Sequence, residues 1–522
     1  MQDDSQVDRR SFIKGAVGSA AGLGVALAAN AAEGPPGINP AKPAQGAGSA
    51  ATFAPIRAEV SIKDCEIEGK LPADLSGGFY ATGPDTQYPP MTPGDIIFDG
   101  EGHVRLFRIR NGRVDYLTRY ARTERFVAQE KAHKKLFPMY RNPYMDDPSV
   151  KGLSRSTANT HVMNHKGLIL SLKEDSPPCA MDLNTLATVD PVYTFEGELP
   201  RTQPFTAHPK VDSHTGNLIG FGYEADGFAS PTIAVFELDA KTGKKVWGTK
   251  IAQPQVGMLH DFAVTENHIC FYSVPLTYDE AQVKRGGIHW SWDRQEKTYF
   301  GFFRRHGDGK DVRWIEGPTQ SGTHTMGVFE DGNKIYLDTE RTAGNPFPFM
   351  PNKDGGPPDF PGAASYLHRI SANLSGKNKG YNLEPLFPLS APLPRQDDRY
   401  NTVAYRYGYA ACPDPNAPPG PGGPAGNCLA RMDIQTKTYE LWNAGTRESL
   451  AEPVFAPKNA KAREGEGYLL AVSYHLDQNL RSDLVILDAE RVKDGPIARV
   501  RLPVQASPQV HGWWVREDQY PA

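Results

Sequence analysis

The sequence has little net charge and no strong run of one sign. Its 522 residues include 57 basic and 61 acidic side chains, which gives a formal net charge of −4 at pH 7. Nucleic acids and anionic membranes bind proteins through concentrated positive charge. The near balance therefore argues against both classes of partner.

Cysteine is also scarce, so the chain is not a small disulfide framework. Of five cysteines, three lie in strand-like or turn surroundings, where buried thiols are expected. Cys412 and Cys428 differ, because they bracket residues 413–427, a loop rich in proline and glycine that has little apolar side chain to hold it. An oxidising compartment would permit a disulfide between these two, and we predict one.

Few stretches keep a helical period for long. Glycine (51 residues) and proline (45 residues) recur throughout the chain and separate short apolar runs. Such runs bounded by turn residues predict mostly antiparallel β-strands. Since no repeat of fixed period is visible, a propeller and a sandwich fit this rhythm equally well. Examples of these runs are residues 167–172, 218–223, 334–338 and 467–472.

The sequence lacks an apolar run that could span a bilayer. Residues 15–29 are short for a span and rich in alanine and glycine. Arg9 and Arg10 precede this run, and Ala29-Asn30-Ala31 is a small-x-small cleavage pattern. We therefore predict a twin-arginine-type signal peptide over residues 1–31 and a periplasmic protein. A flexible linker over 32–53 and a single domain over 54–522 would follow.

No short metal-binding motif is present either. Of 14 histidines, His208, His260, His324 and His511 stand far apart and share no spacing of the His-Glu-x-x-His kind. Taken alone, each is more often an ordinary core or surface histidine. Spacing by itself therefore predicts no metal site.

A series of motifs across the chain nevertheless resembles one family. Six segments carry the resemblance, namely residues 71–80, 98–103, 206–209, 260–262, 452–455 and 511–512. In this order, they resemble the carotenoid cleavage oxygenase superfamily. The resemblance implies an all-β, seven-bladed β-propeller with a loop-rich cap over an axial iron site. It also implies one Fe(II) per chain, held by His208, His260, His324 and His511, with O2 as co-substrate.

Four neutral imidazoles suit ferrous iron and leave coordination positions open for O2. A histidine ligand usually donates its other N–H to a carboxylate or carbonyl that fixes the ring. By resemblance, Glu174 and Glu452 match two of the three glutamates that the family uses for this. The third position is Pro392, so we expect His324 to rely on a water, a backbone carbonyl or another acid such as Asp359.

One branch of the superfamily fits best. Residues 136–150, together with Lys173 directly before Glu174, are similar to the lignostilbene dioxygenase and isoeugenol-cleaving group. There a tyrosine and a lysine hold the substrate's 4-hydroxyl group, and the matching residues are Tyr140 and Lys173. The resemblance implies an Fe(II)-dependent dioxygenase that splits the double bond of a phenolic stilbene or phenylpropene into aromatic aldehydes.

Several alternatives stay open on the sequence. Within the family, an apocarotenoid cleavage oxygenase would have no phenol for Tyr140 and Lys173 to hold. A non-catalytic exported propeller that binds a ligand would retain the fold alone. A propeller oxidoreductase or lactonase that uses another cofactor or Ca²⁺ would need a carboxylate-rich axis instead of four histidines. A small aromatic phenol is the expected binding partner, and both a monomer and a homodimer fit the sequence.

Overall fold

The structure is a computed structural model of the chain. It describes residues 54–89, 96–347, 349–357, 359, 363–376, 378–417 and 426–521. The predicted signal peptide over residues 1–31 and the predicted linker over 32–53 lie outside these described residues.

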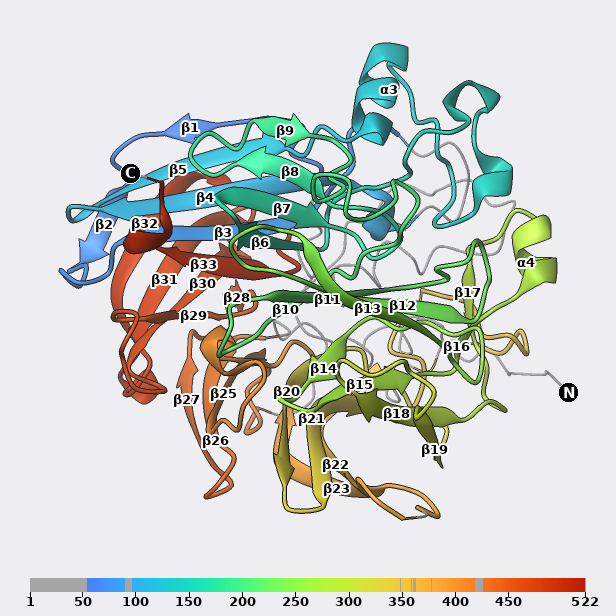
Figure 1. Ribbon diagram of the computed structural model, residues 1–522. Coiled ribbons are helices and arrows are strands. Elements are labelled where there is room, and N and C mark those ends of the chain that lie inside the picture. The colour runs from blue at the N-terminus through green and yellow to red at the C-terminus, as the bar shows by residue number, and fades with distance from the viewer. Residues whose placement is uncertain are drawn as a thin grey trace, which may run out of the picture.

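Strands make up 44% of the chain and helices 7%, and together they form a seven-bladed β-propeller, as predicted (Figure 1). Five blades are antiparallel sheets of four strands in chain order. Their order follows from the short apolar runs and tight turns of the sequence, because each turn returns the chain beside the strand it has just left. The five blades are β6 (His161–His165), β7 (Leu168–Leu172), β8 (Cys179–Asp182) and β9 (Thr188–Asp190); β10 (Lys210–Val211), β11 (Leu218–Tyr223), β12 (Thr232–Leu238) and β13 (Lys245–Ala252); β14 (Phe262–Val264), β15 (His268–Ser273), β18 (Thr298–Arg304) and β19 (Arg313–Gly317); β20 (Thr325–Asp331), β21 (Lys334–Thr342), β22 (Ser365–Asn373) and β23 (Asn382–Ser390); β24 (Arg395–Gln396), β25 (Tyr407–Cys412), β26 (Cys428–Asp433) and β27 (Thr438–Asn443).

The other two blades close the ring, because each combines strands from both ends of the described chain. In one, β3 pairs with β33; in the other, β2 pairs with β32. Closure of this kind joins the first strands to the last through main-chain hydrogen bonds. The strands are β1 (Ser61–Ile62), β3 (Gly77–Asp85), β4 (Glu101–Arg110), β5 (Arg113–Tyr120) and β33 (Gly512–Arg516); β2 (Glu66–Gly69), β28 (Glu448–Leu450), β29 (Val454–Pro457), β30 (Gly467–His475), β31 (Arg481–Asp488) and β32 (Pro496–Gln505).

Loops and short helices gather beyond the strand ends on the right of Figure 1 and form the predicted cap. Two insertions build it, one between β5 and β6 and one between β15 and β18. They bind each other: Asn142 donates its side-chain amide to the carbonyls of Val283 and Gly287 at 2.8 and 2.7 Å. The cap contains α3 (Glu124–Ala132), η2 (Pro143–Met145), η3 (Pro148–Val150), α4 (Glu280–Lys284) and the hairpin of β16 (Leu276–Tyr278) and β17 (Trp290–Trp292).

Both α-helices of the described residues, α3 and α4, begin after a residue whose side chain accepts a hydrogen bond at the helix N-terminus. The Thr123 hydroxyl accepts a hydrogen bond from the Phe126 amide at the start of α3, and Asp279 does the same for Gln282 at α4. No helix in the described part of the chain is long and apolar enough to cross a membrane. The remaining 3-10 turns are η1 (Ile97–Asp99), η5 (Asp398–Tyr400), η6 (Val492–Asp494) and η7 (Glu517–Gln519).

The predicted disulfide between Cys412 and Cys428 is wrong in this structure. Both are buried free thiols, and they face each other as direct partners in the β25–β26 ladder. The strand pairing on both sides of the loop already brings its ends together. The backbone hydrogen bonds therefore do what the sequence analysis assigned to a covalent bridge.

Candidate metal centre

The four candidate histidines occupy equivalent places in four blades. His208, His260, His324 and His511 each lie one or two residues before an end strand of a sheet, namely β10, β14, β20 and β33. In a propeller these end strands converge on the axis. Side chains just before these strands therefore meet, although up to 303 positions separate them in the sequence.

The imidazole nitrogens are close enough to share one ion. One nitrogen from each of the four rings lies within 4.8 Å of all the others, and Nε2 of His208 is 3.1 Å from Nε2 of His260. Metal–nitrogen bonds of roughly 2.0–2.1 Å would place neighbouring nitrogens about 3 Å apart and opposite nitrogens about 4 Å apart. The four rings thus have the spacing of a single metal site with four nitrogen ligands.

The electrostatic state of these rings also fits a metal. Burial lowers the pKa of His208, His324 and His511 well below the ordinary value, and neighbouring positive or histidine groups lower it further. The rings are therefore neutral and keep a lone pair for a ligand bond. Nε2 of His324 and of His511 are buried with no hydrogen-bonding partner among the described residues. A cation shared by the rings would satisfy these buried lone pairs.

Two of the rings are held from behind by the predicted glutamates. Nδ1 of His260 donates to Glu174 at 2.6 Å, and Nδ1 of His511 donates to Glu452 at 2.8 Å. Donation from Nδ1 leaves the Nε2 lone pair free for the metal. His260 and Lys173 outweigh burial and hold the pKa of Glu174 below its ordinary range, so this carboxylate is ionised.

His324 is held differently, as the proline at position 392 leads us to expect. The backbone of Pro392 is a hydrogen-bonding partner of its ring. In addition, Nδ1 of His324 lies 3.1 Å from the Thr323 hydroxyl and 4.0 Å from a carboxylate oxygen of Glu340. Sequence reasoning did not find Glu340.

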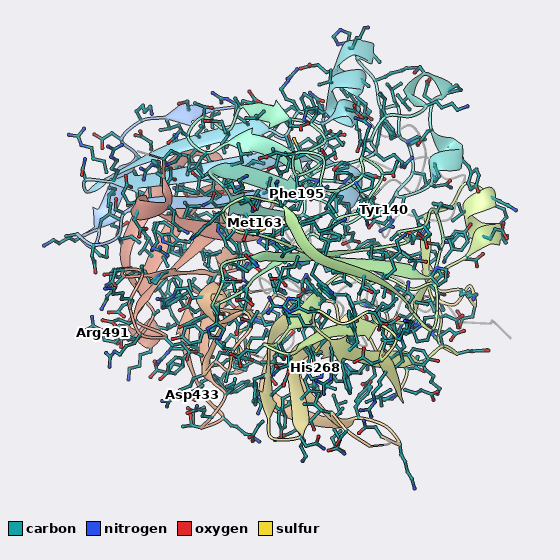
Figure 2. All side chains as sticks on the ribbon, in the orientation of Figure 1. Tyr140, Met163, Phe195, His268, Asp433 and Arg491 are labelled. Carbon is teal, nitrogen blue, oxygen red and sulfur yellow. The ribbon has the colours of Figure 1, made fainter. Side chains whose placement is uncertain are left out.

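The structure also brings Tyr140 and Lys173 together. The ammonium of Lys173 lies 3.3 Å from the Tyr140 hydroxyl, and both side chains are buried. Tyr140 belongs to the cap, on the side of the molecule that carries α3 and α4 (Figure 2), whereas Lys173 directly follows β7. Burial raises the pKa of Tyr140 to about 12, so its hydroxyl keeps its proton. Burial opposes the charge of Lys173, but Tyr140 and Glu174 raise its pKa above the ordinary value.

A buried network that the sequence did not reveal links this pair to His260. Tyr223 donates its hydroxyl to the free oxygen of Glu174 at 3.0 Å, and Arg141 donates to Tyr223 at 2.5 Å. Arg141 also forms an ion pair with Glu224. The only sequence signal for Arg141 was its place next to Tyr140. Its contacts join cap and propeller at the predicted phenol site.

A fifth histidine lies at the same centre, with both ring nitrogens facing backbone carbonyls. His161 is the first residue of β6, and its ring centroid lies 5.6 Å from that of His208. Its Nδ1 donates to the carbonyl of Ala207 at 2.7 Å, and its Nε2 faces the carbonyl of Gly512 at 3.3 Å. His161 therefore packs behind the four rings rather than beside their shared nitrogen cluster.

Charged groups also line a pocket that reaches three of the rings. It contains the ion pair of Lys210 with Asp261 at 2.8 Å, and Arg395, which donates to Glu452 at 3.0 Å. Arg395 thereby holds the carboxylate that binds His511. The pocket leaves room for water-sized molecules beside these rings.

Comparison with known proteins agrees with this arrangement. The family model described as retinal pigment epithelial membrane protein (RPE65) matches residues 53–516. Lignostilbene-alpha,beta-dioxygenase isozyme III of Sphingomonas paucimobilis is 38% identical over 485 residues, covering 91% of this chain and 98% of the relative. Isoeugenol monooxygenase of Pseudomonas nitroreducens is 37% identical over 468 residues, covering 89% and 97%.

A solved structure supports the same conclusion at the level of the fold. The crystal structure of Pseudomonas brassicacearum lignostilbene dioxygenase superimposes with a TM-score of 0.85 at 38% identity, and the match covers 90% of this chain and 98% of that one. The residues that the family model matches, 53–516, include all seven blades and all four histidines. The chain therefore belongs to the RPE65 and carotenoid cleavage oxygenase family of non-haem iron oxygenases, and it is an oxygenase.

Proposed function

We propose that this enzyme cleaves the double bond of a phenolic stilbene or phenylpropene with O2, giving two carbonyl products of which at least one is an aromatic aldehyde. One observation carries the proposal. The Lys173 and Tyr140 pair is buried 3.3 Å apart, and Lys173 is the chain neighbour of Glu174, which holds His260. A phenol bound by this pair would place its conjugated double bond toward the four histidines.

Each residue of the pair has a defined task. The Lys173 ammonium lowers the pKa of a phenol beside it and stabilises the phenolate. Tyr140, whose own hydroxyl keeps its proton, donates a hydrogen bond to the same oxygen. Charge released from the phenolate into the conjugated system raises the electron density of the alkene. The alkene thereby becomes easier to oxidise.

The four histidines would hold one Fe(II), which supplies the O2 chemistry. Glu174 and Glu452 keep two of the rings in the orientation and tautomer that a metal needs. In the overall reaction the carbon–carbon double bond breaks, and each of its two carbons takes one oxygen atom of O2. The balance requires no external reductant and no oxo-acid.

The experiment starts from protein reconstituted anaerobically with Fe(II). Oxygen uptake and products are then measured with 4-hydroxystilbenes, 4-propenylphenols, the methyl ethers of both, and apocarotenoids. We expect cleavage of the phenols and poor cleavage of the ethers. Equal cleavage of phenol and ether would contradict the proposed role of the pair. Cleavage of apocarotenoids alone would favour the other activity of the family, and iron-free, inactive protein would favour a binding propeller.

We also propose that residues 1–31 direct export to the periplasm. The support is the Arg9-Arg10 pair, the apolar run that follows it and the small-residue cleavage pattern ending at Ala31. The match to the family begins at residue 53, after this segment. Cell fractionation of the full chain and of an Arg9→Lys, Arg10→Lys variant tests the proposal. Equal periplasmic amounts of the two would count against it.

A further inference from the structure

We propose that Glu340, acting through the Thr323 hydroxyl, orients His324 at the metal and replaces the carboxylate that Pro392 does not provide. This makes Glu340 and Thr323 positioning residues rather than catalytic ones. The inference rests on the four-histidine metal centre of the proposed function, but not on the identity of the substrate.

The hydrogen bonds around Thr323 define the direction of the relay. The Thr323 hydroxyl donates to Oε1 of Glu340 at 2.7 Å and lies 3.1 Å from Nδ1 of His324. A hydroxyl has one proton to donate, and Oε1 of Glu340, which also accepts from two backbone amides, acts here as the acceptor. Because the proton of Thr323 is committed to Glu340, its oxygen accepts from Nδ1 of His324. The proton of the ring is therefore on Nδ1, and the Nε2 lone pair faces the other histidines.

The opposite arrangement would prevent metal binding. If the Thr323 hydroxyl donated to Nδ1 instead, the ring proton would move to Nε2, which points at the metal position. Glu340 disfavours this arrangement by accepting the hydroxyl proton, and the backbone of Pro392, the other partner of the ring, acts in the same direction. The same oxygen of Glu340 accepts from the backbone amides of Thr323 and His324, at 2.5 and 3.2 Å, so the carboxylate is fixed in place.

A β-bulge brings Glu340 to this position. The ladder of β20 and β21 shifts register between Thr325 and Gly327. Beyond the shift, the amide of Glu340 donates to the carbonyl of His324 at 3.1 Å, so these two residues are cross-strand neighbours. An unbroken ladder would have put Arg341 opposite His324. Bulges are a common means of re-aiming a side chain at a functional site.

The decisive experiment compares iron dissociation from reconstituted holoprotein, measured with a strong chelator, and the EPR signal of the ferrous–nitrosyl complex. Glu340→Gln and Thr323→Val should release iron roughly ten- to a hundred-fold faster than the unmodified protein and change the nitrosyl signal. Thr323→Ser, which keeps the hydroxyl, should behave as the unmodified protein does. Adding Pro392→Glu to Glu340→Gln should slow iron release again, since it restores a direct carboxylate.

A matched control separates this role from general destabilisation. Glu237 is also a buried carboxylate of a blade, and it binds Asn217, Arg305 and His306 rather than a metal histidine. Glu237→Gln should leave iron dissociation and the nitrosyl signal unchanged. Iron release at the unmodified rate from both Glu340→Gln and Thr323→Val would overturn the inference. Because the readout is iron and not turnover, failure of phenol cleavage alone would refute the proposed substrate and leave this inference standing.

Discussion

Lys173 connects two parts of the site through one peptide bond. Its ammonium contacts the Tyr140 hydroxyl, while the next residue, Glu174, binds His260. A shift of the phenol-binding group would therefore also move the support of a metal ligand. This coupling explains why Arg141 and Tyr223 brace Glu174 from its other side.

Replacing Lys173 should remove the preference for phenols. A site built to pair a buried hydroxyl can discriminate by about four orders of magnitude against an analogue that leaves its groups unpaired. We expect Lys173→Ala to lose most activity on a 4-hydroxystilbene and to cleave it no faster than its methyl ether. Competition between the two substrates measures the ratio. Lys166→Ala, in the β6–β7 turn and paired with Glu196, is the control and should keep the preference.

Replacing one metal histidine should empty the site. His260→Ala removes one of four nitrogens and the histidine partner of Glu174, so stoichiometric iron and activity should both be lost. Metal analysis after anaerobic reconstitution checks this, with circular dichroism to show that the variant is folded. His268→Ala is the control, because His268, the first residue of β15, contacts Glu330 of β20 at 2.8 Å and lies outside the four-histidine cluster. Full iron occupancy in His260→Ala would contradict the assignment of this ligand.

At the scale of elements, close contact between β3 and the segment before β33 places His511. The amide of Thr82 donates to the carbonyl of His511, and the amide of Val510 donates to the carbonyl of Thr82, at 3.1 and 2.9 Å. A Cβ on Gly83 would lie 1.6 Å from the carbonyl oxygen of Pro508. The segment can approach β3 this closely only because residue 83 is glycine.

Gly83→Ala should therefore damage both stability and metal binding. The methyl group must push the Pro508 carbonyl away, and overpacking of this kind typically costs about 1–3 kcal/mol. Urea unfolding should show that loss, and iron should dissociate faster because His511 moves with Pro508. Gly380→Ala provides the control, since a Cβ there would come no closer than 3.8 Å to another atom. Unchanged unfolding and iron retention in Gly83→Ala would show that the segment adapts without cost.

The sequence predicts the strands and turns of this fold well, because local apolar runs and turn residues determine them. It does not predict the number of blades, since no fixed repeat marks them, and that expectation came from resemblance. The same holds for the four histidines, whose convergence depends on the ring of blades. Glu340 escaped prediction for a local reason. The turn at Asp331-Gly332-Asn333 is readable, but the bulge that moves Glu340 opposite His324 has no signature in the residue types.

At the scale of the whole molecule, the candidate metal joins blades that have no covalent link at the axis. The ligands come from four of the seven blades, and one of these is the closing blade that holds β3 and β33. A metal bound by all four resists separation of the first and last blades. Because the metal binds the folded chain and not the unfolded chain, its binding stabilises the whole ring of blades.

Removing iron should lower the melting temperature by a small, measurable amount. Free Fe(II) at a thousand times its dissociation constant stabilises the folded state by about 4 kcal/mol. An unfolding entropy of about 2.1 cal/mol/K per residue over roughly 470 residues means that 1 kcal/mol shifts the melting temperature by about 1 °C. Anaerobic calorimetry should therefore show a rise of about 4 °C on adding Fe(II) to iron-free protein. His260→Ala should show no rise, because it lacks a complete ligand set, whereas His268→Ala should respond as the unmodified protein does. An equal response of all three proteins would mean that the stabilising iron binds elsewhere than at the four histidines.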